Sequence, residues 1–267
     1  MTMDTRHRHF AGPAQGGGMK LFLTGDSHVA AIKRGHALLA SRGQLPAAPP
    51  LVIRPFGSAV QMRTSFFVEH DDHLEITDPV YRKRVPVLPA RGFATGSTIY
   101  LLAGPFNFSA VWARPFWRHH WVTGMPPRVG RPYSLGTLRH GLMARLYYQF
   151  RLIDKLLTLG QRLAVVESPG PFRHHPALGL VRADSLVALH RLCRRLVRDE
   201  LARRDVGVVA VPAECWDDDG FIQARFRSDN PEDGHHANTE FGAVMAMECL
   251  RFSGQEAIRG QVAGVAR

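Results

Sequence analysis

Short apolar runs alternate along the chain with longer stretches in which apolar positions recur every three or four residues. The short runs predict buried strands at residues 21–23, 51–53, 98–103, 163–166 and 207–211. The periodic stretches predict amphipathic helices at residues 29–41, 135–159, 184–201 and 239–250, the last capped by Thr239. Strands that alternate with helices favour a parallel sheet covered on both faces. We therefore predict an α/β protein, a three-layer α/β/α sandwich around a mostly parallel five-stranded sheet.

Four segments depart from this pattern. Residues 1–18 are rich in His, Arg and Gly and have little to bury, so we expect a disordered N-terminal extension. Residues 60–97 show only brief alternation, which predicts a hairpin or an excursion from the main fold, and residues 108–135 form an aromatic and basic insertion. Residues 254–267 are expected to be a C-terminal tail. One domain is then expected to span residues 19–253.

The net charge narrows the choice of partners only in part. A formal charge of +11 and a pI near 10.4 are compatible with a polyanionic partner. Most of the excess is arginine spread through helices rich in Ala and Leu, which is typical of solvated helix faces. We therefore expect no nucleic-acid partner, while the oligomeric state cannot be read from the sequence.

The cysteines and the longest apolar runs bear on location. Cys193, Cys215 and Cys249 lie far apart, in no metal-binding spacing, which favours a reducing compartment. No run approaches the roughly 18 apolar residues of a membrane helix. We expect a cytoplasmic protein without a membrane span.

The first predicted strand ends abruptly at Gly25-Asp26-Ser27-His28, where a helix begins. A serine between a strand's carboxyl end and a helix's amino end has backbone N–H groups beside its hydroxyl, which favours developing negative charge. Ser27 is therefore either a nucleophile or an ordinary helix cap. Asp26 beside it is interpreted as a residue that shapes the turn.

Two further turns follow predicted strands and would lie at the same edge of the sheet. Gly57 follows the second strand, and its backbone N–H could face a ligand, although an ordinary turn would also require a glycine. Asn107 follows the third strand in Gly104-Pro105-Phe106-Asn107 and offers a side-chain amide.

A histidine with a carboxylate partner occurs in the loop before the last helix. Asp233 and His236 are three residues apart, close enough for the carboxylate to contact the imidazole. A serine nucleophile needs such a base, oriented by a third group. In isolation, a loop Asp beside a surface His pair would be the simpler interpretation. His235 could replace His236 if the loop were shifted by one residue, but its spacing from Asp233 is less suitable.

Together these motifs carry a resemblance to a known family. GDSH at 25–28, Gly57, Asn107, Asp233-x-x-His236 and the following Asn238 and Gly242 resemble the SGNH, or GDSL-type, hydrolases, and the resemblance covers about residues 19–253. It implies a flavodoxin-like sheet. It also implies Ser27 as nucleophile, His236 as base and Asp233 as its orienting partner. Ser27 N–H, Gly57 N–H and the Asn107 amide would form the oxyanion hole.

The sequence departs from the family pattern at two places. The third motif usually runs Gly-x-Asn-Asp, whereas Asn107 follows Gly104 with one extra residue and without the Asp. His28 stands where Leu is usual; it either lines the pocket or lies on the helix surface.

Other polar clusters give weaker indications. Trp112 and Trp117 in the insertion either contact substrate or cap the core. The pairs His119-His120 and His174-His175 lack companion ligands, and Asp217-Asp218-Asp219-Gly220 is more typical of a solvated acidic turn than of a cation site. We expect neither a metal nor a cofactor.

These observations predict a serine esterase that hydrolyses an O-acyl ester, such as an O-acetylated carbohydrate or another small ester, through an acyl-enzyme. Two alternatives remain: an O-acyltransferase that uses the same triad to acylate a saccharide, and a non-catalytic module that binds carbohydrate or a polyanion. The esterase hypothesis predicts about 3 Å between Ser27 Oγ and a ring nitrogen of His236.

Overall fold

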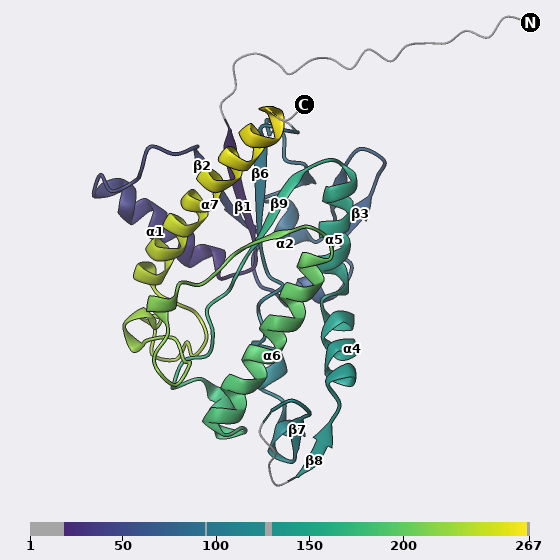
Figure 1. Cartoon of the computed structure of the whole chain (residues 1–267), viewed down its shortest axis with the longest axis vertical. Helices are drawn as coiled ribbons and strands as arrows, with labels where there is room; N and C mark the ends of the chain where they lie inside the picture. The colour runs from purple at the N-terminus through teal and green to yellow at the C-terminus, as the bar shows by residue number, and fades with distance from the viewer. Residues whose placement is uncertain (1–18, 94, 126–129, 266–267) are drawn as a thin grey trace, which may run out of the picture.

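The architecture is that of an α/β protein, seen in a computed structural model that describes residues 19–93, 95–125 and 130–265, with side chains up to residue 254 (Figure 1). The strands are β1 Lys20–Gly25, β2 Leu51–Pro55, β3 Phe67–Glu69, β4 Leu74–Ile76, β5 Val87–Leu88, β6 Thr98–Ala103, β7 His120–Val122, β8 Arg131–Tyr133, β9 Arg162–Val166 and β10 Gly207–Val209. The α-helices are α1 Val29–Ser41, α2 Pro79–Arg82, α3 Ser109–Trp112, α4 Leu135–Arg145, α5 Tyr147–Thr158, α6 Ala183–Ala202 and α7 Thr239–Val265. Short 3₁₀ turns are η1 Gln61–Arg63, η2 Pro115–Arg118, η3 Pro176–Gly179, η4 Ala213–Cys215 and η5 Ala224–Phe226. The predicted extension 1–18 lies outside the described residues.

The central sheet has the strand order β10-β9-β6-β1-β2, and all four pairings are parallel. Numbered along the chain, these five strands lie in the flavodoxin-like order 2-1-3-4-5. The order reverses between β1 and β6, and ligands of open α/β sheets bind outside the carboxyl ends of the strands at such a point. The predicted five-stranded parallel sheet is confirmed.

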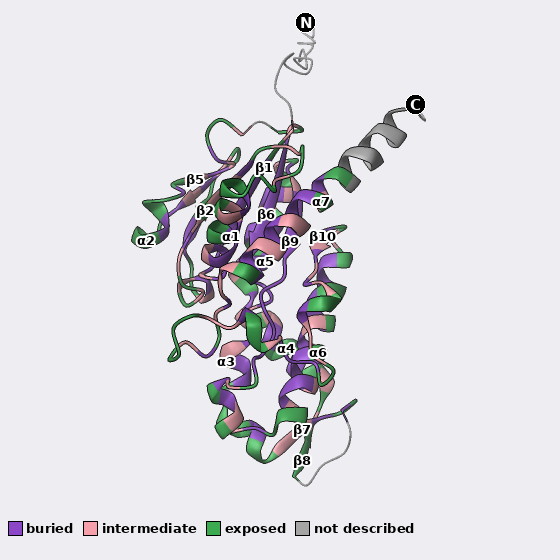
Figure 2. Cartoon of the chain, turned by 90° about the vertical axis from the view of Figure 1, so that its left-hand side faces the viewer, coloured by how far each residue is buried: buried purple, intermediate pink, exposed green. Residues whose placement is uncertain are grey.

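Alternating side chains of the strands supply two separate cores. Leu21, Leu23 and Leu101 pack into one apolar cluster with α1 and α7, whereas Phe22 and Tyr100 pack into a second cluster with α5 and α6. Figure 2 shows the central strands β1, β6 and β9 largely in the colour of buried residues. The predicted three-layer sandwich follows from this period of two.

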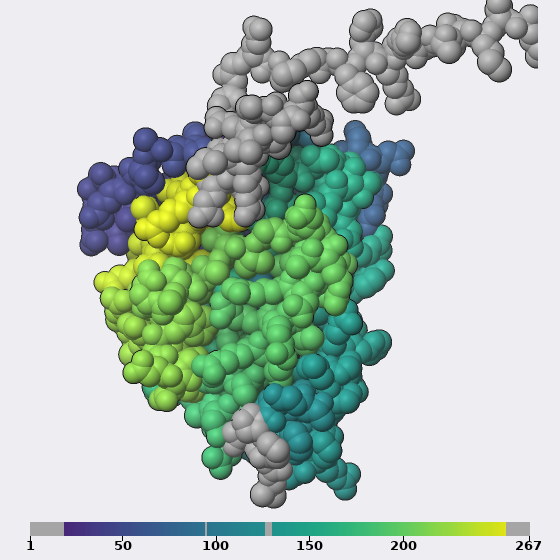
Figure 3. Space-filling view, in the orientation of Figure 1, coloured from purple at the N-terminus to yellow at the C-terminus, as the bar shows by residue number. Residues whose placement is uncertain are grey.

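Helices α1 and α7 pack unusually closely. A Cβ atom on Gly242 would lie 1.8 Å from the carbonyl oxygen of Ala31, and one on Gly35 would lie 1.9 Å from the Ala243 nitrogen. Figure 3 shows α1 and α7 adjoining on one face of the molecule. Two glycines therefore allow the helix that begins beside Ser27 to contact the helix that follows His236.

The two irregular segments fold beside this sandwich. Residues 60–97 contain the antiparallel sheet β3-β4-β5 and the short helix α2, in place of a simple hairpin. The insertion contains α3, η2 and the parallel pair β7–β8, which lies with α4 at the end of the molecule farthest from β2 and β3 in Figure 1. No helix among the described residues is long and apolar enough to span a membrane.

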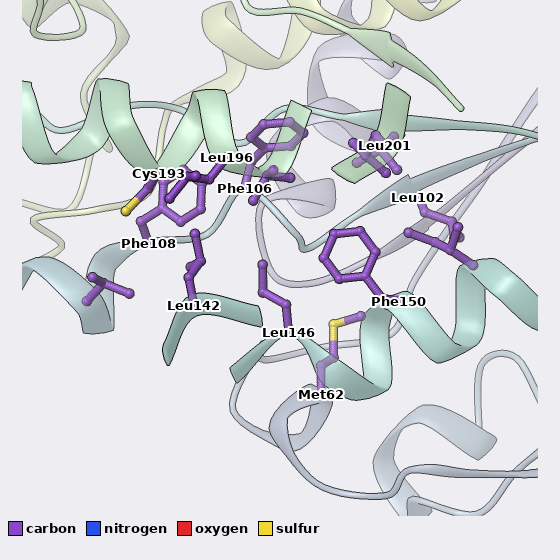
Figure 4. Packing of buried hydrophobic residues seen from close by; sticks show 14 of the residues in the cluster. Met62, Leu102, Phe106, Phe108, Leu142, Leu146, Phe150, Cys193, Leu196 and Leu201 are labelled. Atoms are coloured by element: carbon purple, nitrogen blue, oxygen red, sulfur yellow. The ribbon is translucent and has the colours of Figure 1, made fainter. Parts of the chain in front are cut away.

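Several predicted boundaries were wrong. The single helix expected at 135–159 is divided into α4 and α5 at Leu146, which has φ −93° and ψ 6°. Apolar positions keep their helical spacing across this residue, and neither proline nor glycine marks it, so the pattern could not reveal the division. Figure 4 shows Leu142 and Leu146 pointing toward Phe106 and Phe108, the contacts that hold the two helices against the core.

The end of the chain and two other boundaries also differ. Helix α7 continues to Val265 through the segment expected to be a tail, because an interior glycine such as Gly254 costs a helix only about 1 kcal/mol. Asn238, not Thr239, caps this helix, since its Oδ1 accepts from Phe241 N at 3.1 Å. Strand β10 ends at Val209, two residues earlier than expected.

Candidate active site

The turn after β1 is fixed by its backbone and by a buried carboxylate. Gly25 has φ +141°, and a Cβ there would lie 2.0 Å from the Ala103 carbonyl oxygen, so only glycine fits. Asp26, fully buried, accepts from His28 N at 3.1 Å through Oδ1 and from Asn107 Nδ2 at 3.0 Å through Oδ2. The interpretation of Asp26 as a residue that shapes the turn agrees with these bonds.

The predicted serine, histidine and aspartate come together across 209 residues of sequence. Ser27 Oγ lies 2.7 Å from His236 Nε2, and His236 Nδ1 lies 2.9 Å from Asp233 Oδ2. The first distance agrees with the expected 3 Å. Ser27 does not cap α1 through its side chain, because its hydroxyl contacts the imidazole, and no side-chain cap is found at the start of that helix.

The surroundings of Asp233 stabilise its ionised form. Its Oδ1 accepts hydrogen bonds from His236 N at 3.0 Å and from His235 N at 3.3 Å. Partial burial by itself raises the pKa of Asp233. The hydrogen bonds from His236 and His235 and the charge of the His236 imidazole outweigh that effect and lower the pKa to about 2. A carboxylate facing Nδ1 favours the tautomer with the proton on that atom, so Nε2 is free to accept from Ser27.

Three potential donors lie in the segments that follow β1, β2 and β6. Among the described residues, the backbone N–H groups of Ser27 and Gly57 donate to no protein acceptor. Gly57 has φ +153° and lies two residues after the end of β2. The Asn107 amide uses one N–H for Asp26, which leaves its second N–H unused. The structure thus brings Ser27 and Asn107 together through Asp26.

Two further histidines lie against His236. His28 is buried, and its ring centroid is 5.0 Å from that of His236; His235 is half-exposed, with its centroid at 4.0 Å. Burial lowers the pKa of His28 to about 4, and burial also lowers the pKa of His235. Both rings are then neutral at pH 7. His28 lines the site and does not lie on the helix surface.

The two tryptophans named from the sequence occupy different places. Trp112 is buried, with its ring 5.2 Å from that of His175 and 5.3 Å from that of His190. Trp117 lines a pocket of about 190 Å³ between the insertion and α4.

Two polar clusters among the described residues could in principle hold a metal ion: the acidic turn at residues 217–220 and the group around Asp233. In the acidic turn, Asp217 accepts from Arg173 Nε at 2.8 Å, and Asp219 pairs with the same guanidinium, so arginine takes the place a cation would occupy.

Asp233, His235 and His236 each offer a metal-ligand atom within 4.8 Å of one another. However, both ring nitrogens of His236 already face Asp233 and Ser27, so these residues fit a proton relay better than a metal site.

Sequence reasoning missed one residue that positions the site. Tyr81, fully buried in α2, donates its hydroxyl to the Ser58 carbonyl and thereby holds the loop that carries Gly57. It belongs to the irregular segment 60–97, where no periodic pattern marked it. Helix α2 was not predicted from the sequence; only a cap signal could have indicated it, since Asp78 accepts from Val80 N at 2.9 Å and Pro79 follows it.

Comparisons with known proteins give likenesses of low identity. No protein-family model matches the chain, and no curated protein matches it. A GDSL-like lipase from Bacteroides thetaiotaomicron is 10% identical with a TM-score of 0.45, covering 90% of this chain and 88% of that one. A carbohydrate acetylesterase family member from Sinorhizobium meliloti is 13% identical with a TM-score of 0.43, covering 88% and 97%. At this level the likenesses do not decide the activity, which has to be inferred from the geometry around Ser27.

Proposed function

We propose that the chain is a serine esterase of the SGNH type that hydrolyses an O-acyl ester, with Ser27 as nucleophile, His236 as base and Asp233 as its orienting partner. The observation that carries this proposal is the continuous path of contacts from Asp233 through His236 to Ser27 Oγ, with distances of 2.9 and 2.7 Å. A hydroxyl at the carboxyl edge of a parallel sheet, beside a histidine held by a carboxylate, is the arrangement that acyl transfer requires.

In the first half of the reaction, Ser27 Oγ attacks the ester carbon while its proton moves to His236 Nε2. The carbonyl π bond opens to a tetrahedral oxyanion. Collapse of this intermediate breaks the bond to the alcohol oxygen, and His236 gives its proton to the departing alcohol. An acyl-enzyme on Ser27 remains.

In the second half, water takes the place of the alcohol. His236 removes its proton as the oxygen attacks the acyl carbon, and the same proton returns to Ser27 Oγ when the acid leaves. Asp233 stays ionised throughout, since its pKa of about 2 lies well below the working pH. Its role is to hold the imidazole and to stabilise the positive charge that forms on it.

We assign the oxyanion hole to Ser27 N–H, Gly57 N–H and the unused N–H of the Asn107 amide. Donors already in place when charge develops contribute about 3–4 kcal/mol each. The support for Asn107 is the hydrogen bond that its amide donates to Asp26. Asp26 directly precedes Ser27 in the chain, so this bond holds the amide beside the nucleophile's turn.

Turnover of p-nitrophenyl acetate tests the proposal. Ser27→Ala and His236→Ala should each lower kcat by at least about 10³-fold. His235→Ala and Ser41→Ala are the matched controls, because His235 adjoins the base without contacting Ser27 and Ser41 lies exposed at the far end of α1. Both controls should retain turnover within a few-fold. Equal loss in His235→Ala and His236→Ala, or turnover that survives Ser27→Ala, would reject the assignment.

Product analysis separates hydrolysis from acyl transfer. With an O-acetylated saccharide as substrate and a second saccharide added as acceptor, the esterase yields free acetate alone. Acetylation of the added saccharide would instead assign the same three residues to a transferase.

A further inference from the structure

A pocket of about 190 Å³ lies between the insertion and helix α4. Its described lining combines three aromatic rings, several apolar side chains and two guanidinium groups, and it contains no carboxylate: Val111, Arg114, Phe116, Trp117, Tyr133, Leu138, Gly141, Leu142 and Arg145. This volume is below the roughly 300–1,000 Å³ of a drug-sized site, so it suits one small ring. Aromatic walls pack against such a ring, while the arginines would attract a negative charge.

Arg145 is the most unusual residue of this lining. Its Nη2 atom is buried without a hydrogen-bond partner among the described residues, and no described carboxylate pairs with Arg145 or Arg114. Burial lowers the pKa of Arg145 to about 10, with further lowering by the charges of Arg63 and Arg114. Arg63, Arg114 and Arg145 therefore lie close enough to repel one another, and no described carboxylate pairs with any of them. The buried Nη2 of Arg145 has no acceptor among the described residues, which is costly unless a ligand supplies one.

The pocket adjoins the catalytic edge of the sheet. Its Val111 wall belongs to α3, which begins two residues after Asn107, and Trp117 Nε1 donates to the Val111 carbonyl at 2.7 Å. Arg145 is the last residue of α4, and the buried Gln149 lies four residues further along the chain, in α5. The Oε1 atom of Gln149 lies 3.1 Å from where a Cβ on Gly104 would be, at the carboxyl end of β6. Both walls are thus linked to the segment from Gly104 to Asn107, which carries the Asn107 amide.

We propose that this pocket binds a single sugar ring that carries a carboxylate or a phosphate, so that the ester cleaved at Ser27 is an O-acylated acidic saccharide. The ring contacts Trp117 and Tyr133, and its anionic group accepts from Arg145 and Arg114. This inference rests on the proposed function for the ester chemistry, but the pocket itself can be tested without turnover.

Direct binding to the whole chain tests the pocket. Titration calorimetry measures the Kd of three probes: methyl glucuronoside with a carboxylate, glucose 6-phosphate with a phosphate, and neutral methyl glucoside. At least one anionic probe should bind at least tenfold more tightly than methyl glucoside. The stronger of the two anionic probes identifies the anionic group. Equal affinity for all three, or no binding of any probe, would overturn the proposal.

Variants locate the binding. Arg145→Met should remove most of the anionic preference, about tenfold in Kd. Arg114→Met changes an exposed residue and should weaken the preference in the same direction. Arg131→Gln is the matched control, because it removes a positive charge from the same insertion outside the pocket lining. An unchanged preference in both pocket variants, or an equal loss in Arg131→Gln, would place the effect elsewhere.

Hydrolysis of p-nitrophenyl acetate by the same preparation separates this inference from the proposed function. Active protein that fails to distinguish the anionic probes would reject the acidic-saccharide pocket alone. Selective binding by a protein with no turnover would reject the esterase and leave the pocket standing.

Discussion

At the scale of single residues, the charge and the hydrogen bonds of Asp233 together hold the His236 imidazole in one tautomer. The two oxygens of Asp233 accept hydrogen bonds from His236 Nδ1 and from two backbone N–H groups, and His235 Nδ1 lies 3.4 Å from Oδ1. An asparagine keeps the shape but loses the charge and can donate to Nδ1, which favours the wrong tautomer of His236. We predict that Asp233→Asn lowers kcat by about 10³–10⁴-fold. Asp229→Asn, exposed in the same loop, is the control and should have little effect on ester turnover.

Asn107 offers a second test at this scale. Asn107→Ala removes one proposed donor to the oxyanion and should lower kcat by about 10²–10³-fold with little change in KM. Ser109→Ala removes the 2.8 Å bond that Ser109 Oγ makes to Asn107 Oδ1 but keeps the amide. Steady-state kinetics should show less than a tenfold loss of kcat in Ser109→Ala. Equal losses in the two variants would indicate that Asn107 acts only by holding the turn.

The sequence predicted some of these residues better than others. Asp233 and His236 stand three apart in one loop, so their contact depends on local spacing and could be anticipated. The bond between Asn107 and Asp26 depends on how β6 aligns with β1 and on an extra residue in the turn, neither of which a single sequence specifies. Tyr81 could not be found at all, because its contact with Ser58 joins two irregular segments.

At the scale of elements, the contact between α1 and α7 links the helix that begins beside Ser27 to the helix that follows His236. Gly242→Ala places a methyl group 1.8 Å from the Ala31 carbonyl oxygen, so the helices must separate. We predict a loss of about 1–3 kcal/mol in the free energy of unfolding, measured by urea denaturation. Gly254→Ala in the same helix has open space around it and should stabilise by up to about 1 kcal/mol. Destabilisation of similar size in both variants would contradict close packing as the cause.

Helices and strands were predicted correctly where apolar residues recur at a regular spacing. The prediction failed where tertiary contacts or an interior glycine decided where a helix ends. The five sheet strands and helices α1 and α6 follow from apolar spacing alone. The division at Leu146 and the continuation of α7 past Gly254 depend on tertiary contacts and on the small cost of an interior glycine, so periodicity did not indicate them.

At the scale of the whole molecule, buried neutral histidines should make stability sensitive to acid. Burial lowers the pKa of His28 and His175 to about 4; burial, followed by the nearby Arg194 and Arg191, lowers that of His190 to about 3. Unfolded histidine titrates near 6.5, so between about pH 4 and 6.5 the unfolded chain binds more protons than the folded one. Stability should therefore fall as pH drops through this window.

His190→Phe tests this effect, since His190 packs among the rings of Phe108, Trp112 and Trp216. The free energy of unfolding of the wild type should fall between pH 7 and pH 5 by about 2 kcal/mol more than that of the variant. Asp233 affects stability in a lower pH range than the histidines. Its lowered pKa stabilises the fold above about pH 4, and that stability is lost only as the pH falls toward 2. Parallel stability curves for wild type and variant above pH 5 would contradict the prediction.

Covalent labelling of the intact chain tests the central claim most directly. A fluorophosphonate reacts with an activated serine by forming a phosphorus–oxygen bond and expelling fluoride, and peptide mass spectrometry locates the adduct. The proposed role of Ser27 predicts a single adduct at that residue, absent in Ser27→Ala and formed much more slowly in His236→Ala. An adduct on any other serine, or an unlabelled Ser27 in protein that still hydrolyses aryl acetate, would contradict it.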